Sequence, residues 1–563
     1  MSTTRSTFSR ALADRQSDPA RRRWLYVPYD QLSDRIGPMA AEDPRELGIV
    51  VVESPCKATR RPYHRQKLAL VLANLRHFAL EQAGRGVAVR HIVASGPYRT
   101  ALEPLARELG PIRVMRPAER ELRVDLASLV AAGALVEIPH EGWLTTRKDF
   151  ESGRREGPPW RLDSFYRQVR RRTGILMDGG KPVGGKLSLD ADNRRPWPGD
   201  PPAPEPPRFR PDQVTVEVGE LVERSFARHP GTVDLGSLPA TRRDAERLWA
   251  WARCECLHDF GPFEDAMSAR SSGLFHTRIS TLLNLHRLLP AEVVHDVLAM
   301  DIPLASKEGF IRQVLGWREF VHHVHEATDG FRNLPGAVAC IAEQPGDAGW
   351  SRWSGVGWDR HDGDDGGDGG AMPDHLEASR PLPVAYWGRP SGLACLDRVV
   401  ADVWREGWSH HITRLMVLAN IATLLSVSPR ELTDWFWIAY ADAYDWVVEP
   451  NVLGMGSFAT GPLMTTKPYL CGAAYIDRMS DFCAGCSFDP KRDCPISNLY
   501  WAFLDRQRGR LESNPRMRVV MNALSARPST RLDADRSIHR WVAETLGRGE
   551  VLRPEDRPGR RPG

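Results

Sequence analysis

The stretch that decides the fold is LGIVVVE at 47–53, followed by KLALVLANLRHFALEQ at 67–82. The first is a short apolar run rich in β-branched residues, and the second repeats its apolar residues at helical spacing. Similar apolar bursts lie around this pair, namely WLYV at 24–27, VAVRHIVAS at 87–95, IRVM at 112–115 and ALVEIP at 134–139. Short strands that alternate with helices predict a doubly wound parallel sheet covered by helices on both faces. We therefore expect an α/β domain over residues 23–150.

Several classes of protein are excluded by composition and by the first turn. Asp30-Gln31-Leu32 follows the first predicted strand in place of Gly-x-Gly-x-x-Gly, which disfavours NAD binding. No window offers the roughly 18 uninterrupted apolar residues of a membrane span, and the first 24 residues lack the apolar core of a secretory signal. Lys plus Arg is 76 against 72 acidic residues, so the net charge of +4 does not by itself indicate nucleic acid.

The rest of the chain divides by pattern. We expect a flexible basic tail at 1–22 and an interdomain linker at 151–238, dense in Gly and Pro at 178–213. Apolar residues then recur at helical spacing over 239–525, which predicts an all-α domain. Within it, the acidic, Gly-rich tract near 345–376 is expected to be a disordered insertion. Residues 526–563 are expected to form a C-terminal helix and tail.

The strongest chemical signal is Cys483-Ala-Gly-Cys486, followed by Cys494-Pro495. Two thiolates three residues apart can share one metal centre, and a third can fold back to it. Spacing alone leaves the fourth ligand open, with Cys395 and Cys471 as candidates and Cys340 behind them. It also does not separate an iron–sulfur cluster from zinc, or either from unliganded core cysteines.

A second signal is the pair His410-His411 at the start of HHITRLMVLANIATLL. Adjacent helical residues point about 100° apart, so one histidine can lie in a helix interface while the other approaches a cavity. Arg414 follows one turn later, and Asp442 in YADAY supplies a carboxylate that could pair with it. Surface histidines and an ordinary salt bridge are the plainer interpretation of the same residues.

These motifs together resemble one family. The order SHHITRL, YADAY, PNVLGMGSFATG, TKPY, RMSDFCAGC and CP, with GFIRQVLGWREF upstream, resembles the iron–sulfur bacterial cryptochromes and photolyases. In the first domain DQLS, VVES, HRQKLALVLANLRHFA and MDGGKPVGGKLSLDADNR resemble the same branch. The resemblance covers nearly the whole chain and implies that the helical domain binds FAD.

The resemblance also implies roles for particular residues. It assigns a 4Fe-4S cluster to Cys395, Cys483, Cys486 and Cys494, which leaves Cys471 and Cys340 to packing. It assigns FAD binding to Thr277, Ser280, Arg414, Asp442 and Tyr444, and electron transfer to Trp387 and Trp435. His410 and His411 match the double histidine of enzymes that repair 6-4 photoproducts, in which the second histidine donates a proton. Phe436 stands where the family often has a tyrosine, so a final electron hop there needs another ring.

Many members of this branch carry an antenna, 6,7-dimethyl-8-ribityllumazine, in the first domain. Asp30, Gln31 and Glu53 match antenna positions, but Lys57 and Arg60 stand where the family has acidic and tyrosine residues. We therefore expect an altered antenna pocket.

The implied function is light-driven repair of a 6-4 photoproduct flipped out of UV-damaged DNA by a monomeric protein of the bacterial cytoplasm. Two other functions stay open. A cryptochrome photoreceptor would use the same flavin photoreduction to signal without repair. A zinc-stabilised nucleic-acid-binding protein would have no light chemistry.

Overall fold

A computed structural model describes residues 6–152, 158–335, 337, 338, 340–360 and 366–559 of the chain. Five parallel strands form one sheet in the order β3-β2-β1-β4-β5. The strands are β1 (Arg23–Tyr26), β2 (Leu47–Glu53), β3 (Ala88–Val93), β4 (Ile112–Met115) and β5 (Leu135–Ile138). Each predicted apolar burst forms a strand, which confirms the doubly wound sheet.

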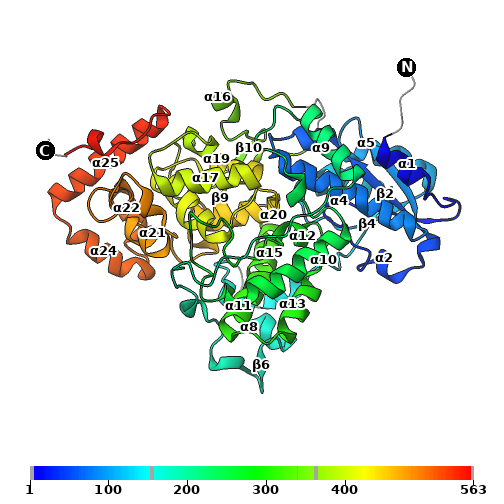
Figure 1. Cartoon of the computed structure of the whole chain (residues 1–563), viewed down its shortest axis with the longest axis horizontal. Helices are drawn as coiled ribbons and strands as arrows, with labels where there is room; N and C mark the ends of the chain where they lie inside the picture. The colour runs from blue at the N-terminus through cyan, green and yellow to red at the C-terminus, as the bar shows by residue number, and fades with distance from the viewer. Residues whose placement is uncertain (1–5, 153–157, 336, 339, 361–365, 560–563) are drawn as a thin grey trace.

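Helices cover both faces of this sheet, at the right of Figure 1. They include α4 (Arg65–Gly84), α5 (Tyr98–Leu109) and α6 (Arg120–Ala131). Strand β2 is buried along its whole length. Its residues alternate between two hydrophobic clusters, with Val50 and Val52 on one face and Ile49 and Val51 on the other. This two-sided burial explains why β2 is a continuous apolar run.

The remainder of the described chain is mainly helical, as predicted. The helices used below are α8 (Leu162–Thr173), α9 (Gln213–Ser225), α12 (Ser280–Asn284), α15 (Glu319–Ala327), α16 (Trp350–Ser354), α17 (Ala394–Glu406), α19 (Pro429–Ala439), α22 (Pro495–Arg506) and α25 (Ser529–Gly547). Helices α1 (Thr7–Ala13) and α25 lie at opposite ends of the molecule (Figure 1). No described helix combines the length and the hydropathy needed to span a bilayer.

The sheet domain and the helical domain share one hydrophobic core, which runs from Trp24 to Leu552. At the contact between them Tyr29 stacks on Tyr444, with ring centroids 6.3 Å apart. Lys67 of α4 is buried, and its Nζ donates to the carbonyls of Trp437 and Ala443. The domains are therefore joined by buried apolar and polar contacts.

Three segments differ from the sequence-based expectations. Within the expected tail, residues 7–13 form α1, where Phe8 and Leu12 are buried against the sheet domain. The expected linker contains α8 and α9, and α9 packs on α4. Both helices have the apolar stripe that a covered helix needs. The linker was expected because the Gly and Pro content at 178–213 was given more weight than these stripes.

The acidic insertion also has an ordered part. Residues 361–365 lie outside the described residues, so the expectation for them stays a prediction. Asp368, however, is ion-paired with Arg332, and Ala371 in β11 (Gly370–Ala371) is fully buried. These contacts are distant in sequence and leave no local pattern, which is why composition alone suggested disorder.

Candidate functional site

The centre of the helical domain holds a buried ion pair. Arg414 donates from Nη1 and Nη2 to the two carboxylate oxygens of Asp442, at 3.0 and 2.9 Å. The Ser280 hydroxyl, at the start of α12, donates to the same carboxylate at 2.7 Å, and Asn284 donates to the Asp442 carbonyl at 2.9 Å. Arg414 holds the pKa of Asp442 below its usual range despite burial. The predicted pair therefore exists as a fixed, charged unit.

Three of the five predicted flavin-binding residues meet here. Ser280, Arg414 and Asp442 are in direct contact, and Thr277 is buried in the segment just before Ser280. Tyr444 is placed differently, because its ring stacks on Tyr29 of the sheet domain and not on this pair.

A cluster of three histidines lies beside the ion pair. The His276 ring stacks on His410 with centroids 4.5 Å apart, and the His411 ring lies 5.4 Å from His276. Among the described residues, these three are the group of His, Cys, Asp or Glu whose ligand atoms all lie within 4.8 Å of one another. Nδ1 of His410 and Nε2 of His276 are buried without a hydrogen-bond partner in the described structure. Such orphaned ring nitrogens are suited to a bound polar ligand.

The environment keeps these histidines neutral. Burial, together with the charges of Arg312 and Arg414, lowers the pKa of His411 to about 4, although Asp190 acts in the opposite direction. Burial and the His411 charge hold the pKa of His410 well below its usual range. Protonated His411 is therefore a minor form at neutral pH.

Aromatic rings extend outward from the ion pair. The Arg414 guanidinium lies 4.1 Å from the centroid of Tyr440, and the Tyr440 ring lies 6.1 Å from that of Trp435. Trp435 is fully buried on α19, whereas Trp387 is half-buried. The two predicted electron-transfer tryptophans thus lie at different depths.

Four cysteines surround one small apolar cavity. Cys395 lies in the first turn of α17, Cys483 and Cys486 lie on a short turn, and Cys494 caps α22. Burial raises the pKa of Cys395, and the other three thiols raise it further, which reflects their proximity.

The other two candidate cysteines lie elsewhere. Cys471 is hydrogen-bonded to the Asn420 side chain, and Cys340 is exposed near β11.

The spacing of the four sulfurs bears on the type of metal centre. Within the part of the chain that the structure describes, no three of these sulfurs lie within 4.8 Å of one another. In a tetrahedral zinc site with Zn–S bonds of ~2.3 Å, neighbouring sulfurs are about 3.8 Å apart. The arrangement is therefore wider than the ligand shell of a single zinc ion.

The three expected antenna residues differ in their partners within the described structure. Asp30 is buried with both carboxylate oxygens unpaired among the described residues, and burial raises its pKa to about 7. Gln31 donates to the Met115 carbonyl at 3.0 Å. Glu53 is instead ion-paired with Arg76 and hydrogen-bonded to His91. Glu53 is thus already used within the sheet domain.

Ion pairs also fill the space beside Lys57. Its Nζ lies 2.6 Å from Glu121, which also pairs with Arg60 and Arg61. The cavity next to Lys57 has a volume of about 10 Å³, room for about one water. The residues at these positions do not fit a lumazine ring.

Two residues at the site were missed by the sequence analysis. His276 directly precedes Thr277 in HTRIS, and its place beside the double histidine is set by tertiary packing. Trp404 on α17, six residues before His410, stacks on Trp387. Only the general abundance of tryptophan, 18 against 11 tyrosines, pointed toward it.

The amino-acid sequence is similar to known proteins over most of its length. Residues 25–236 match the family model described as deoxyribodipyrimidine photo-lyase-related protein. The chain is 33% identical over 511 residues to a protein of Agrobacterium fabrum named (6-4) photolyase, which covers 87% of this chain and 92% of that protein.

A solved structure shows the same fold. A cryptochrome of Synechocystis sp. PCC6803 aligns over 92% of this chain and 99% of its own, with a TM-score of 0.51 and 14% identity. A class III photolyase of Agrobacterium tumefaciens covers 95% of this chain and 99% of its own, with a TM-score of 0.48 and 14% identity. With the (6-4) photolyase match spanning most of both proteins, the chain belongs to the photolyase/cryptochrome family of flavoproteins.

Proposed function

We propose that this protein repairs 6-4 photoproducts in UV-damaged DNA, using light, FAD and a histidine proton donor. The observation that carries the proposal is the contact of His276, His410 and His411 beside the Arg414–Asp442 pair. The family relationship implies FAD, and the A. fabrum relative is named for this lesion.

The residues at the centre of the helical domain fit a flavin. Arg414 offers a fixed positive charge and Ser280 a hydroxyl, and orphaned histidine nitrogens lie next to them. Reduced FAD, when bound there and excited by light, supplies one electron to the lesion. Asp442 fixes the orientation of the Arg414 guanidinium group, because the carboxylate accepts from both Nη1 and Nη2.

His411 is the proposed proton donor, with His410 and His276 as its supports. Burial, and after it the charges of Arg312 and Arg414, lowers the pKa of His411 and disfavours its protonated form in the unliganded protein. A flipped lesion brings phosphate groups to this site, which offset those cations and raise the pKa of His411. The proton is then available at the imidazole when the reduced lesion needs it.

The four cysteines are proposed to hold a 4Fe-4S cluster that joins α17 to the start of α22. The wide spacing of the sulfurs supports a cluster over a single zinc ion. Its role is structural, since the repair cycle returns its electron to the flavin and needs no second redox centre.

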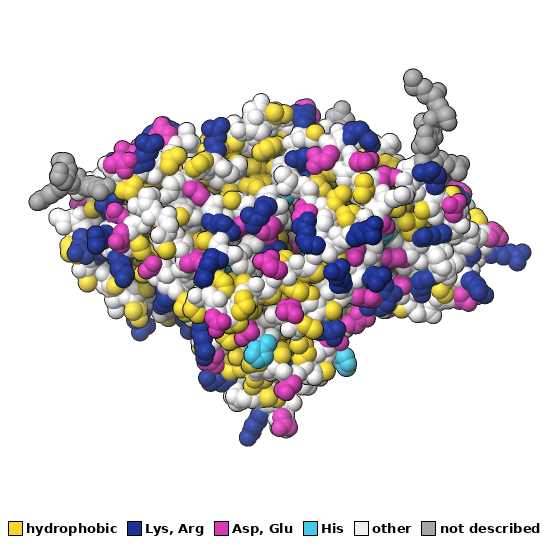
Figure 2. Space-filling model, in the orientation of Figure 1, with side chains coloured by type: hydrophobic (Ala, Val, Ile, Leu, Met, Phe, Trp, Pro, Cys, Tyr) yellow, Lys and Arg dark blue, Asp and Glu magenta, His cyan; other side chains and the backbone are white. Residues whose placement is uncertain are grey.

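DNA contact depends on local rather than global charge. Figure 2 shows basic side chains interspersed with acidic ones over the visible face, in line with the net charge of +4. Added salt is therefore expected to weaken duplex binding, and the steepness of this effect should reflect the number of DNA phosphates that the protein contacts.

The test is an absorption spectrum of protein purified without air, followed by repair assays on oligonucleotides with a single lesion. Flavin bands together with light-dependent restoration of the pyrimidines at a 6-4 lesion support the proposal. A flavin-containing protein that is photoreduced but restores no pyrimidines contradicts it and favours a cryptochrome photoreceptor. A colourless protein contradicts both.

A further inference from the structure

The electron route predicted from the family pattern has a gap in this chain. Phe436 is buried next to Trp435, with centroids 5.2 Å apart, and stacks on Tyr440. A phenylalanine ring is not oxidised under conditions that oxidise tryptophan or tyrosine. Trp435 therefore needs another partner if it is to exchange electrons with the protein surface.

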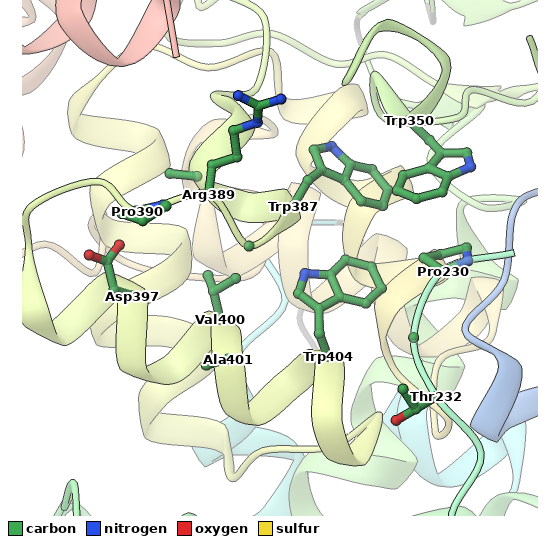
Figure 3. Close-up of a pocket in the computed structure, with 13 residues that line it drawn as sticks. Pro230, Thr232, Trp350, Trp387, Arg389, Pro390, Asp397, Val400, Ala401 and Trp404 are labelled. Carbon is green, nitrogen blue, oxygen red and sulfur yellow. The ribbon is translucent and has the colours of Figure 1, made fainter. Parts of the chain in front are cut away.

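The structure supplies such a partner from α17. The ring of Trp404 lies 6.1 Å from Trp435 and 5.1 Å from Trp387, and it is nearly parallel to the latter. The ring of Trp350, on α16, lies 5.0 Å from Trp387. Trp350, Trp387 and Trp404 together line a surface cavity of about 480 Å³ (Figure 3). These four indoles thus lead from the buried centre to solvent in steps of 5.0–6.1 Å.

Hydrogen bonds hold the two inner indoles to one acceptor. Nε1 of Trp404 and Nε1 of Trp435 both donate to the Tyr386 carbonyl, at 2.8 and 2.9 Å. The shared carbonyl fixes the relative orientation of the two rings, and its negative end stabilises positive charge on either indole.

The neighbours of Trp404 also favour its oxidation. The His64 ring stacks on Trp404 with centroids 5.6 Å apart, and burial lowers the pKa of His64 to about 4. The imidazole is therefore neutral at pH 7 and does not oppose a cation on Trp404. By contrast, the Arg61 guanidinium lies 3.7 Å from the ring of Trp437, where its charge disfavours oxidation. The nearby charge therefore distinguishes Trp437 on α19 from Trp404 on α17.

We propose that Trp404 carries electrons between Trp435 and Trp387, with Trp350 as the outer end of the route. The proposal rests on flavin photoreduction, which is part of the proposed function. Trp435 gives one electron to light-excited oxidised flavin and regains one from Trp404, which regains one from Trp387. Trp387 regains one electron from Trp350, and Trp350 regains one from a soluble thiol. Each thiol releases its proton to water, and two oxidised thiols join as a disulfide.

The experiment compares photoreduction in the full-length, FAD-loaded protein under blue light with dithiothreitol. Trp404→Phe is expected to slow flavin bleaching by roughly tenfold or more, a barrier increase of ~1.4 kcal/mol or greater. Trp387→Phe interrupts the same route one step further out and is expected to act likewise. Trp353→Phe is the matched control, because this tryptophan of α16 lies under Arg352 and outside the chain of rings.

Two further measurements separate a local effect from misfolding. Near-ultraviolet circular dichroism of the FAD-loaded variants reports the coupling of the Trp387 and Trp404 rings, which Trp404→Phe removes and Trp353→Phe retains. The lifetime of the tryptophan radical, measured by transient absorption, is expected to shorten when Trp404 is replaced. The positive charge is then confined to Trp435, where it recombines with the flavin electron.

Each outcome has a definite meaning. If Trp404→Phe and Trp387→Phe photoreduce the flavin at the wild-type rate, the route is overturned and the proposed function is left intact. Bound flavin that is not photoreduced in the wild-type protein overturns the proposed light chemistry and the route together. Equal slowing in Trp353→Phe overturns the assignment to this particular chain of rings.

Discussion

The contribution of the Arg414–Asp442 pair can be tested by removing one partner. Asp442→Ala deletes the acceptor of two guanidinium bonds and one Ser280 bond, and it leaves the guanidinium buried without its counter-ion. Removing one member of a buried ion pair costs ~3–5 kcal/mol. The Arg414 side chain is 23% exposed and can reach some water, so we expect about 3 kcal/mol, the lower end of that range.

The assay is urea denaturation of the flavin-free protein followed by tryptophan fluorescence, with flavin content measured separately on the loaded protein. Because the pKa of Asp442 is lowered in the folded protein, its stabilisation is present at neutral pH and lost as the pH falls through that value. The difference between wild type and Asp442→Ala is therefore expected to shrink below pH ~4.

Glu550→Ala serves as a control, since it breaks the exposed Arg548–Glu550 pair and is expected to leave the denaturation midpoint unchanged. A loss for Asp442→Ala below ~1 kcal/mol, the scale of exposed pairs, together with full flavin content would refute this account.

Four further predictions concern the other parts of the site. Cys395→Ala is expected to lose iron and lower the denaturation midpoint, because a cluster links distant segments, whereas Cys471→Ala keeps its iron; iron analysis showing the reverse would mean that the fourth ligand is Cys471. His411→Asn is expected to keep FAD, photoreduction and DNA binding while abolishing 6-4 repair, and wild-type repair activity rules out its role as the acid. In the wild-type protein, repair is expected to fall as the pH rises through the pKa of His411 in the DNA complex, a value higher than the 4 or so of the free protein; a profile with no such fall in the lesion-saturated enzyme contradicts this. Mass spectrometry of ligands released from native protein is expected to find no stoichiometric lumazine, and its recovery would show that Asp30 and Gln31 suffice to hold it.

The sequence predicted the sheet well because its evidence is local. Each strand of the sheet is an apolar burst of the length that a parallel strand needs, and each boundary fell within a residue or two. The helix α1 was missed because its apolar face contains little more than Phe8 and Leu12, too short a pattern to distinguish from a tail.

The site was predicted in part for the same reason. The pairing of Arg414 with Asp442 could be predicted because oppositely charged side chains in a helical core need each other as counter-ions, and the two are in direct contact in the structure. His276 and Trp404 carry no such demand, and their positions depend on how α17 and the HTRIS segment pack in three dimensions. Glu53 shows the opposite case, in which a matching position is used by neighbours, Arg76 and His91, that the pattern did not reveal.

The single hydrophobic core shared by the two domains limits how this protein can be recombined with its relatives. The side chain of Lys67 lies against carbonyls of the helical domain, and Tyr29 packs on Tyr444. A chimera that joins this sheet domain to a relative's helical domain must therefore carry both sides of that contact, or it buries an ammonium group with no acceptor. A crossover in the Gly- and Pro-rich segment before α9 also places α4 and α9 in different parents, so the packing between these two helices must be matched as well. When domains are exchanged between relatives, the stability of the chimera therefore depends on whether the two contact surfaces match, even where both parents have the same fold.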